Sequence, residues 1–151
     1  MEKDLAVIVV NYIQFENVKP AVDELIRQGF CTDFFIPTFA AGDGFDAMTE
    51  DLQNILQKEG YPVFRSANDD FYKVLLEPYP CGMPIRHKYL LRYRYTLLST
   101  KPNIVYVPEK YLMYDAILCS GTLESAFLSA YGKTFPVGDL KYEHFTKRKI
   151  E

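Results

Sequence analysis

Residues 115–138 read DAILCSGTLESAFLSAYGKTFPVG, and this stretch decides the fold class. Ala116 to Cys119 is a short apolar run of the kind that forms a buried parallel strand. After a turn, apolar residues recur at helical spacing, which predicts a buried helix face of Leu123, Ala126, Phe127, Ala130 and Tyr131. Gly132 is placed to end this helix in a left-handed conformation, and Thr134 to Val137 is predicted to be the next strand.

The turn of this unit is a candidate ligand site. Ser120, Gly121 and Thr122 stand between the carboxyl end of a strand and the start of a helix, which is where ligands bind in open α/β sheets. They also offer helix N-caps and free backbone N–H groups that suit an anion. Glu124 in the first turn is favourable for the helix dipole.

The rest of the chain repeats the alternation of strands and helices. Leu5 to Val10 is a continuous aliphatic run, and it predicts a central strand buried on both faces. Later strands are predicted at residues 34–37, 61–65 and 73–76. Two amphipathic helices lie between them, one with Pro20 in its first turn and Gly29 at its end, the other closed by Gly60.

This pattern predicts an α/β fold, a Rossmann-like three-layer sandwich with a mostly parallel sheet of five or more strands covered by helices on both faces. The domain spans residues 1–138, and residues 139–151 are a polar tail or the start of an interdomain linker. Asn11 and Tyr12 leave the first strand toward the same edge, so each is a candidate ligand contact or simply a turn residue.

Composition excludes several classes of protein. A formal net charge of -3 argues against a general nucleic-acid binder. The three cysteines, an odd number and scattered, give neither a disulfide framework nor a metal-binding spacing, so no metal is predicted. The loop with Gly42 and Gly44 lacks both the dinucleotide fingerprint and a phosphate loop, so no cofactor is predicted. No apolar run is long enough to span a membrane and no signal peptide opens the chain, which favours the cytoplasm.

The segment EPYPCGMPIRHK, residues 77–88, predicts an irregular loop at the carboxyl end of a strand. A basic, tyrosine-rich helix is predicted to follow over residues 89–98. Cations near a helix start oppose its dipole, so we expect the cluster to meet an anion such as phosphate, although a solvated basic face is the alternative. The cluster consists of Arg86, His87, Lys88, Arg92 and Arg94. The same helix is a candidate for peripheral contact with the inner face of a membrane.

Cys81 is also a candidate nucleophile, with His87 as its local base. That chemistry needs a lowered thiol pKa, and the alternative is a small residue tolerated in a loop.

The loop Cys81-Gly82-Met83-Pro84-Ile85-Arg86 resembles the His-Gly-x-Pro-Leu-Lys loop of the CDP-glycerol glycerophosphotransferases. These bacterial transferases, the polymerases and primases of teichoic acid in the cell wall, have two domains in the GT-B arrangement. Tyr114 to Ser120, the following helix and Phe135 to Gly138 are similar to the family's passage into its interdomain linker.

The resemblance implies the acceptor-binding N-terminal half of such a transferase, inactive alone, with a phosphorylated polyol or sugar as acceptor and a second, nucleotide-binding domain as partner. The family's catalytic His stands at the position of Cys81. His87 could replace it only if the loop folds back.

Three functional classes therefore stand: the transferase half, a non-catalytic α/β binding module for a phosphorylated or polar small ligand, and a thiol enzyme. In each, we expect the ligand between the loop of residues 81–88, with Gly82, Arg86 and Lys88, and the turn at residues 120–122.

Overall fold

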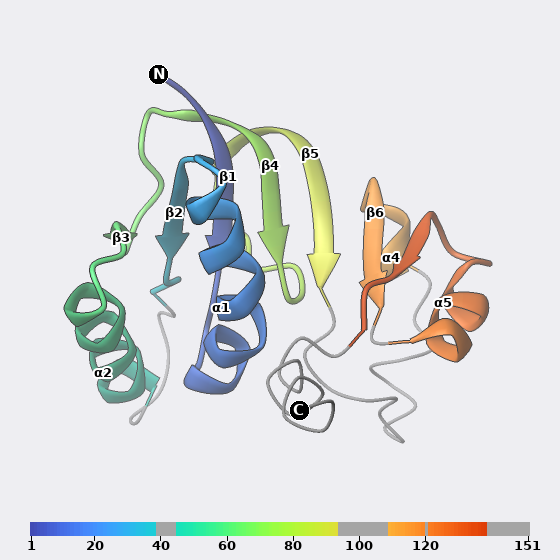
Figure 1. Ribbon diagram of the computed structural model, residues 1–151, viewed down its shortest axis with the longest axis horizontal. Coiled ribbons are helices and arrows are strands. Elements are labelled where there is room, and N and C mark those ends of the chain that lie inside the picture. Colours follow the sequence, from blue (N-terminus) through green and yellow to red (C-terminus); the bar gives the residue numbers. More distant parts are fainter. Residues whose placement is uncertain (39–44, 94–108, 120, 139–151) are drawn as a thin grey trace.

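A computed structural model describes residues 1–38, 45–93, 109–119 and 121–138 (Figure 1). The elements in chain order are β1 Glu2–Ile8, α1 Tyr12–Arg27, β2 Thr32–Phe35, α2 Phe45–Lys58, β3 Val63–Phe64, β4 Phe71–Glu77, β5 Arg86–Tyr93, α4 Glu109–Leu112, β6 Ala116–Cys119, α5 Thr122–Leu128 and β7 Thr134–Pro136. The predicted tail at residues 139–151 and the glycine loop at residues 40–44 lie outside the described residues.

The described strands form one seven-stranded sheet in the order β3-β2-β1-β4-β5-β6-β7, and every pair is parallel. The register places Val7 of β1 between Phe34 of β2 and Leu76 of β4. Strands 3-2-1-4-5-6 follow the order of doubly wound Rossmann sheets. The predicted Rossmann-like α/β fold is confirmed, and neither β1 nor β6 is an edge strand.

The aliphatic run of β1 packs on both faces of the sheet. Leu5 and Val7 join a core with α1 and α2, whereas Ala6 and Ile8 join a second core on the opposite face. The second face continues toward β6, where Ile117 packs with Tyr111 and Leu128 of the α4 and α5 region. Helices therefore cover both faces, as predicted, with α1 and α2 on one face and α4 and α5 on the other (Figure 1).

Helix α1 begins earlier than predicted. Asn11 is its N-cap, and its side-chain oxygen accepts a hydrogen bond of 2.9 Å from the backbone N–H of Gln14. The prediction that Pro20 lies in the first turn is wrong, because the Asn cap extends the helix by two turns before it and Pro20 stands inside it. Gly29 and Gly60 follow the ends of α1 and α2, as predicted, and both have positive φ.

The predicted helix over residues 89–98 is wrong as far as the structure describes it, because residues 86–93 form strand β5. Leu90 and Leu91 are both partly buried, and they contact opposite faces of the sheet. Tyrosine packs well on the pleated surface of a strand. Because β5 lies inside the sheet between β4 and β6, a strand can bury Leu90 and Leu91 in part on its opposite faces. A helix would expose one of the two leucines. Residues 94–98 lie outside the described residues.

The predicted buried face of α5 is wrong except at Tyr131, which packs against the core around Ile117. Leu123 is 74% exposed and Phe127 is exposed too, while Glu124 and Leu128 are buried. The helix meets the sheet through the Leu128 side, since Leu128 packs on Ile117. Gly132 does not take the predicted left-handed conformation.

Candidate functional site

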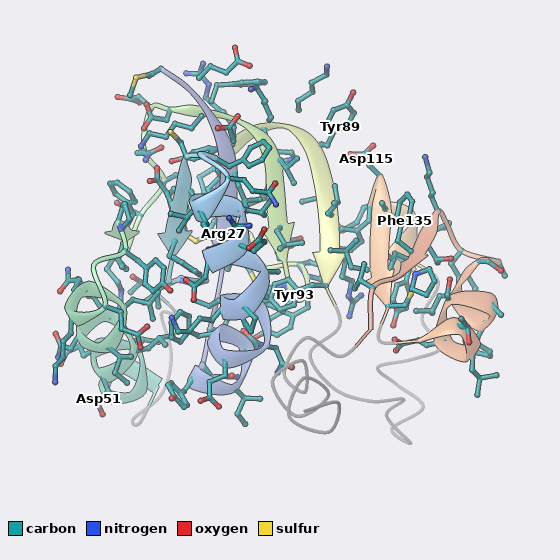
Figure 2. The ribbon with its side chains drawn as sticks, viewed as in Figure 1. Arg27, Asp51, Tyr89, Tyr93, Asp115 and Phe135 are labelled. Carbon is teal, nitrogen blue, oxygen red and sulfur yellow. The ribbon has the colours of Figure 1, made fainter. Side chains whose placement is uncertain are left out.

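The predicted basic residues lie at the wrong edge of the sheet for the expected site. Arg86 and His87 begin β5 and pair with Phe71 and Tyr72, the first residues of β4. Strand arrows point downward in Figure 1, so this is the upper, amino-terminal edge; Figure 2 shows Tyr89 toward that end of β5. Gly121 and Thr122 follow the carboxyl end of β6 at the opposite edge. The structure therefore does not bring Arg86 and His87 together with this turn.

The connection between β4 and β5 explains this separation. Only residues 78–85 join the two strands, with no helix among them. Eight extended residues span about 26 Å, close to the length of a seven-residue strand, so this connection is only just long enough to return along the sheet. Tyr79, Cys81 and Met83 pack against the second core on the way. A parallel neighbour strand must start at the amino edge, and this carries Arg86 there.

The displaced basic residues have local partners. Arg86 Nη1 donates to the carbonyl of Asp69 at 3.3 Å, and Nδ1 of His87 lies 2.7 Å from the carbonyl of Ile85. Lys88 Nζ lies 4.9 Å from the ring centroid of its neighbour Tyr89. These contacts tie the start of β5 to adjacent segments.

Cys81 and its surroundings do not favour a thiolate. Burial above all, and then the charge of Glu77, raises the pKa of Cys81 to about 12. Its thiol contacts the carbonyl of Tyr79 at 3.0 Å. A neutral thiol is a weak nucleophile, so this environment weighs against the thiol-enzyme hypothesis. Gly82 next to it has a φ of +69°, which fits a glycine in this tight loop.

Glu77 and Arg92 form the charged part of a buried cluster that sequence reasoning missed. They are only 4% and 3% exposed, and they stand side by side at the carboxyl ends of β4 and β5. Tyr114 Oη donates to Glu77 Oε1 at 2.8 Å, and Arg92 Nε donates to the carbonyl of Pro78 at 3.1 Å. The Arg92 guanidinium lies 4.4 Å from the ring centroid of Tyr111. The signal in the sequence is a charged residue directly after two leucines in each strand, Glu77 after Leu75 and Leu76 and Arg92 after Leu90 and Leu91.

Burial raises the pKa of Glu77 above its usual value. The hydrogen bonds from Tyr114 and from the backbone of Cys81, together with the charges of His87 and Arg92, oppose that rise. A buried carboxyl with a raised pKa is a common feature of functional sites, although structural networks show it too.

The strand order reverses direction between β1 and β4, and helix α1 starts beside this switch point. Gln14 in its first turn is 0% exposed, and its Oε1 accepts a hydrogen bond of 2.7 Å from the backbone N–H of Val10. Gln14 Nε2 has no hydrogen-bond partner in the described part of the chain. Nearby, Tyr93 Oη donates to the carbonyl of Ile8 at 2.8 Å, and Figure 2 shows Tyr93 at the lower end of β5.

Of the predicted site residues, Asn11 and Tyr12 lie at this switch point, Asn11 as the cap and Tyr12 half-exposed in the first turn. The turn before α5 is less suited to an anion. Its N-cap is Gly121, without a side-chain cap, and the helix is only seven residues long. Ser120 lies outside the described residues.

An apolar groove of about 350 Å³ opens between α1 and the sheet on the face that carries α1. Its walls come from α1, from β4, β5 and β6, and from Val137 and Gly138 after β7. Lys73 and Asp4, an ion pair with 2.8 Å between Nζ and Oδ1, are its charged residues.

Among the residues that the structure describes, no cluster of three or more His, Cys, Asp or Glu side chains could hold a metal ion. None of the described helices is both long and apolar enough to cross a bilayer. A scan of protein-family models, a search of curated proteins and a search of solved structures each return no match for this chain.

Proposed function

We propose that this chain is a ligand-binding α/β domain that holds a phosphorylated polyol or another polar small molecule at the carboxyl edge of the sheet, where α1 begins. The observation that carries the proposal is the spare Nε2 donor of Gln14 at the β1–β4 switch point. Open α/β sheets bind ligands at such points.

The backbone adds donors at the same place. The backbone N–H groups of Tyr12 and Ile13 open α1, and the structure gives them no acceptor among the described residues. The N–H groups at a helix start and the helix dipole both favour an anionic oxygen. Gln14 would add a third, side-chain donor. A neutral or phosphorylated hydroxyl compound can use all three.

The resemblance to CDP-glycerol glycerophosphotransferases gives this site a place in a reaction. We propose that the domain is the acceptor-side half of a two-domain transferase, whose second domain would bind the nucleotide donor. In support, the loop that carries the resemblance follows β4, at the switch point. The neutral thiol of Cys81 cannot serve as a base there, so the buried carboxyl of Glu77, which accepts the Cys81 N–H, would take the proton of the acceptor hydroxyl.

A stand-alone binding module is the second candidate, and the same site would serve it. The reading frame beyond residue 151 separates the two. A following α/β domain with a nucleotide site supports the transferase half.

The test is a titration of the chain with sn-glycerol 3-phosphate, read by backbone amide chemical shifts. We expect shifts at Asn11 to Phe15, and an affinity loss of about ten-fold or more in Gln14→Glu, which keeps the acceptor for Val10 but replaces the donor by a negative charge. Gln57→Glu on the exposed side of α2 makes the same charge change and should bind normally. Arg86→Ala should also bind normally, because Arg86 lies at the other edge.

Shifts confined to residues 86–88, or equal affinity of Gln14→Glu and Gln57→Glu, would contradict the proposed site.

A further inference from the structure

We propose that the groove beside α1 is a second, independent site, which binds the chain of a fatty acid and places its carboxylate at Lys73. The inference starts from the sheet. All-parallel sheets have both faces covered, yet Leu76, Leu91 and Leu118 are only partly buried beside α1 and form the floor of the groove.

The groove has the shape for one slender apolar ligand. Helix α1 forms one wall of the groove with Val18, Ala21 and Leu25. Val137 and Gly138, which follow β7, also line the groove. The volume of about 350 Å³ lies in the range of small-molecule sites. Its uncharged polar side chains, Asn17 and Tyr93, already hydrogen-bond to carbonyls of the chain. The interior therefore offers contacts to methylene groups.

Charge at one end selects the head group. Asp4 accepts hydrogen bonds from Lys73 Nζ at 2.8 Å and from the backbone N–H of Cys31 at 3.0 Å. Lys73 has three N–H donors, and Asp4 is its one partner among the described residues. Its side chain is 54% exposed, and the hydrogen bond to Asp4 raises its pKa, so the ammonium stays charged. The remaining donors suit a carboxylate.

The probe is dodecanoate below its micelle-forming concentration, titrated into the chain and read by methyl and amide shifts. We expect shifts at Leu25, Leu91 and Leu118 and saturable binding. Dodecyltrimethylammonium, with the same chain and the opposite charge, should bind about ten-fold more weakly or worse.

Two variants test the apolar part of the groove and its charged end separately. Ala21→Trp places an indole in the groove and should abolish binding. Lys73→Met keeps the apolar stem, removes the ammonium and should weaken dodecanoate binding about ten-fold, while Lys58→Met, at the last turn of α2, should not. Should Ala21→Trp fail to fold, the Lys73 pair and the two head groups still decide.

Three results would overturn the inference: no saturable shift of the groove leucines, equal binding of the two head groups, or binding to phosphatidylglycerol vesicles without binding of free dodecanoate. Gln14→Glu should weaken the binding of glycerol phosphate and leave the binding of dodecanoate unchanged. Either proposal can therefore fail without the other.

Discussion

Tyr114 Oη donates a hydrogen bond of 2.8 Å to Oε1 of Glu77, which lies 37 positions earlier in the chain. The bond joins the segment before β6 to the end of β4, two strands away in the sheet. Both side chains are buried. A buried carboxylate without such donors would carry the full cost of its desolvation, so this bond makes the charged cluster tolerable in the core.

Tyr114→Phe should lower the free energy of unfolding by about 1–3 kcal/mol, because the change removes one donor and leaves the Glu77 oxygen unsatisfied. Urea denaturation followed by circular dichroism measures this. Tyr89→Phe deletes the same hydroxyl on an exposed ring and serves as the control. Equal stability of the two variants would show that water or another group replaces Tyr114.

Glu77 should make stability depend on pH in a defined direction. Burial raises its pKa in the folded state above its usual value of 4.5, so the folded protein keeps the proton at a pH where the unfolded chain has lost it. The resulting stabilisation is fully present below pH 4.5 and is lost as the pH rises through the folded pKa. The free energy of unfolding of the wild type, minus that of Glu77→Gln, should therefore decrease as the pH rises across this window.

The control is Glu2→Gln, an exposed carboxyl at the start of β1. Urea titrations at a series of pH values give both differences. A Glu77 difference that stays constant, or that increases with pH, contradicts a raised pKa.

The sequence pattern predicts a strand well where the residues of that strand are enough to identify it. The runs Leu5 to Ile8 and Ala116 to Cys119 contain no alternating polar residues, so the pattern predicts burial on both faces, although Leu118 is only partly buried. The same logic fails for β5, because tyrosines and arginines suit the surface of a helix and a strand alike. Only the neighbours β4 and β6 decide its conformation.

The candidate site was harder to predict. The sequence predicts Arg86 inside a loop at the carboxyl edge of the sheet. The structure shows instead that residues 78–85 return along the sheet and that Arg86 begins β5, as its register with Phe71 reveals. The partners of Arg92 and Glu77, namely Tyr111 and Tyr114, come from a distant segment that no local pattern connects to them. The sequence predicts Asn11 as a ligand contact or a turn residue. Its role as the N-cap follows only from the position at which α1 begins.

The two helix starts at the carboxyl edge should respond to mutation in opposite directions. Asn11→Ala removes the side-chain cap of α1 and should cost about 0.5–2 kcal/mol of stability. Gly121→Ser adds a capping hydroxyl to α5 and should stabilise by a few tenths of a kcal/mol, since Gly121 is extended and an added Cβ has nothing within 4 Å. Thermal unfolding of both variants checks the signs, and stabilisation by Asn11→Ala contradicts the cap.

The chain alone should not catalyse transfer from CDP-glycerol. The proposed transferase works across a cleft between two domains, and the described residues form one sheet, with the acceptor site proposed at its edge. Binding energy from both substrates is needed to bring the acceptor hydroxyl and the phosphate into line, and the described residues carry a proposed site for the acceptor alone. Release of CMP, measured by chromatography with glycerol 3-phosphate present, should therefore equal that of a protein-free control. Release above that control that is lost in Glu77→Gln would show instead that this domain binds the donor itself.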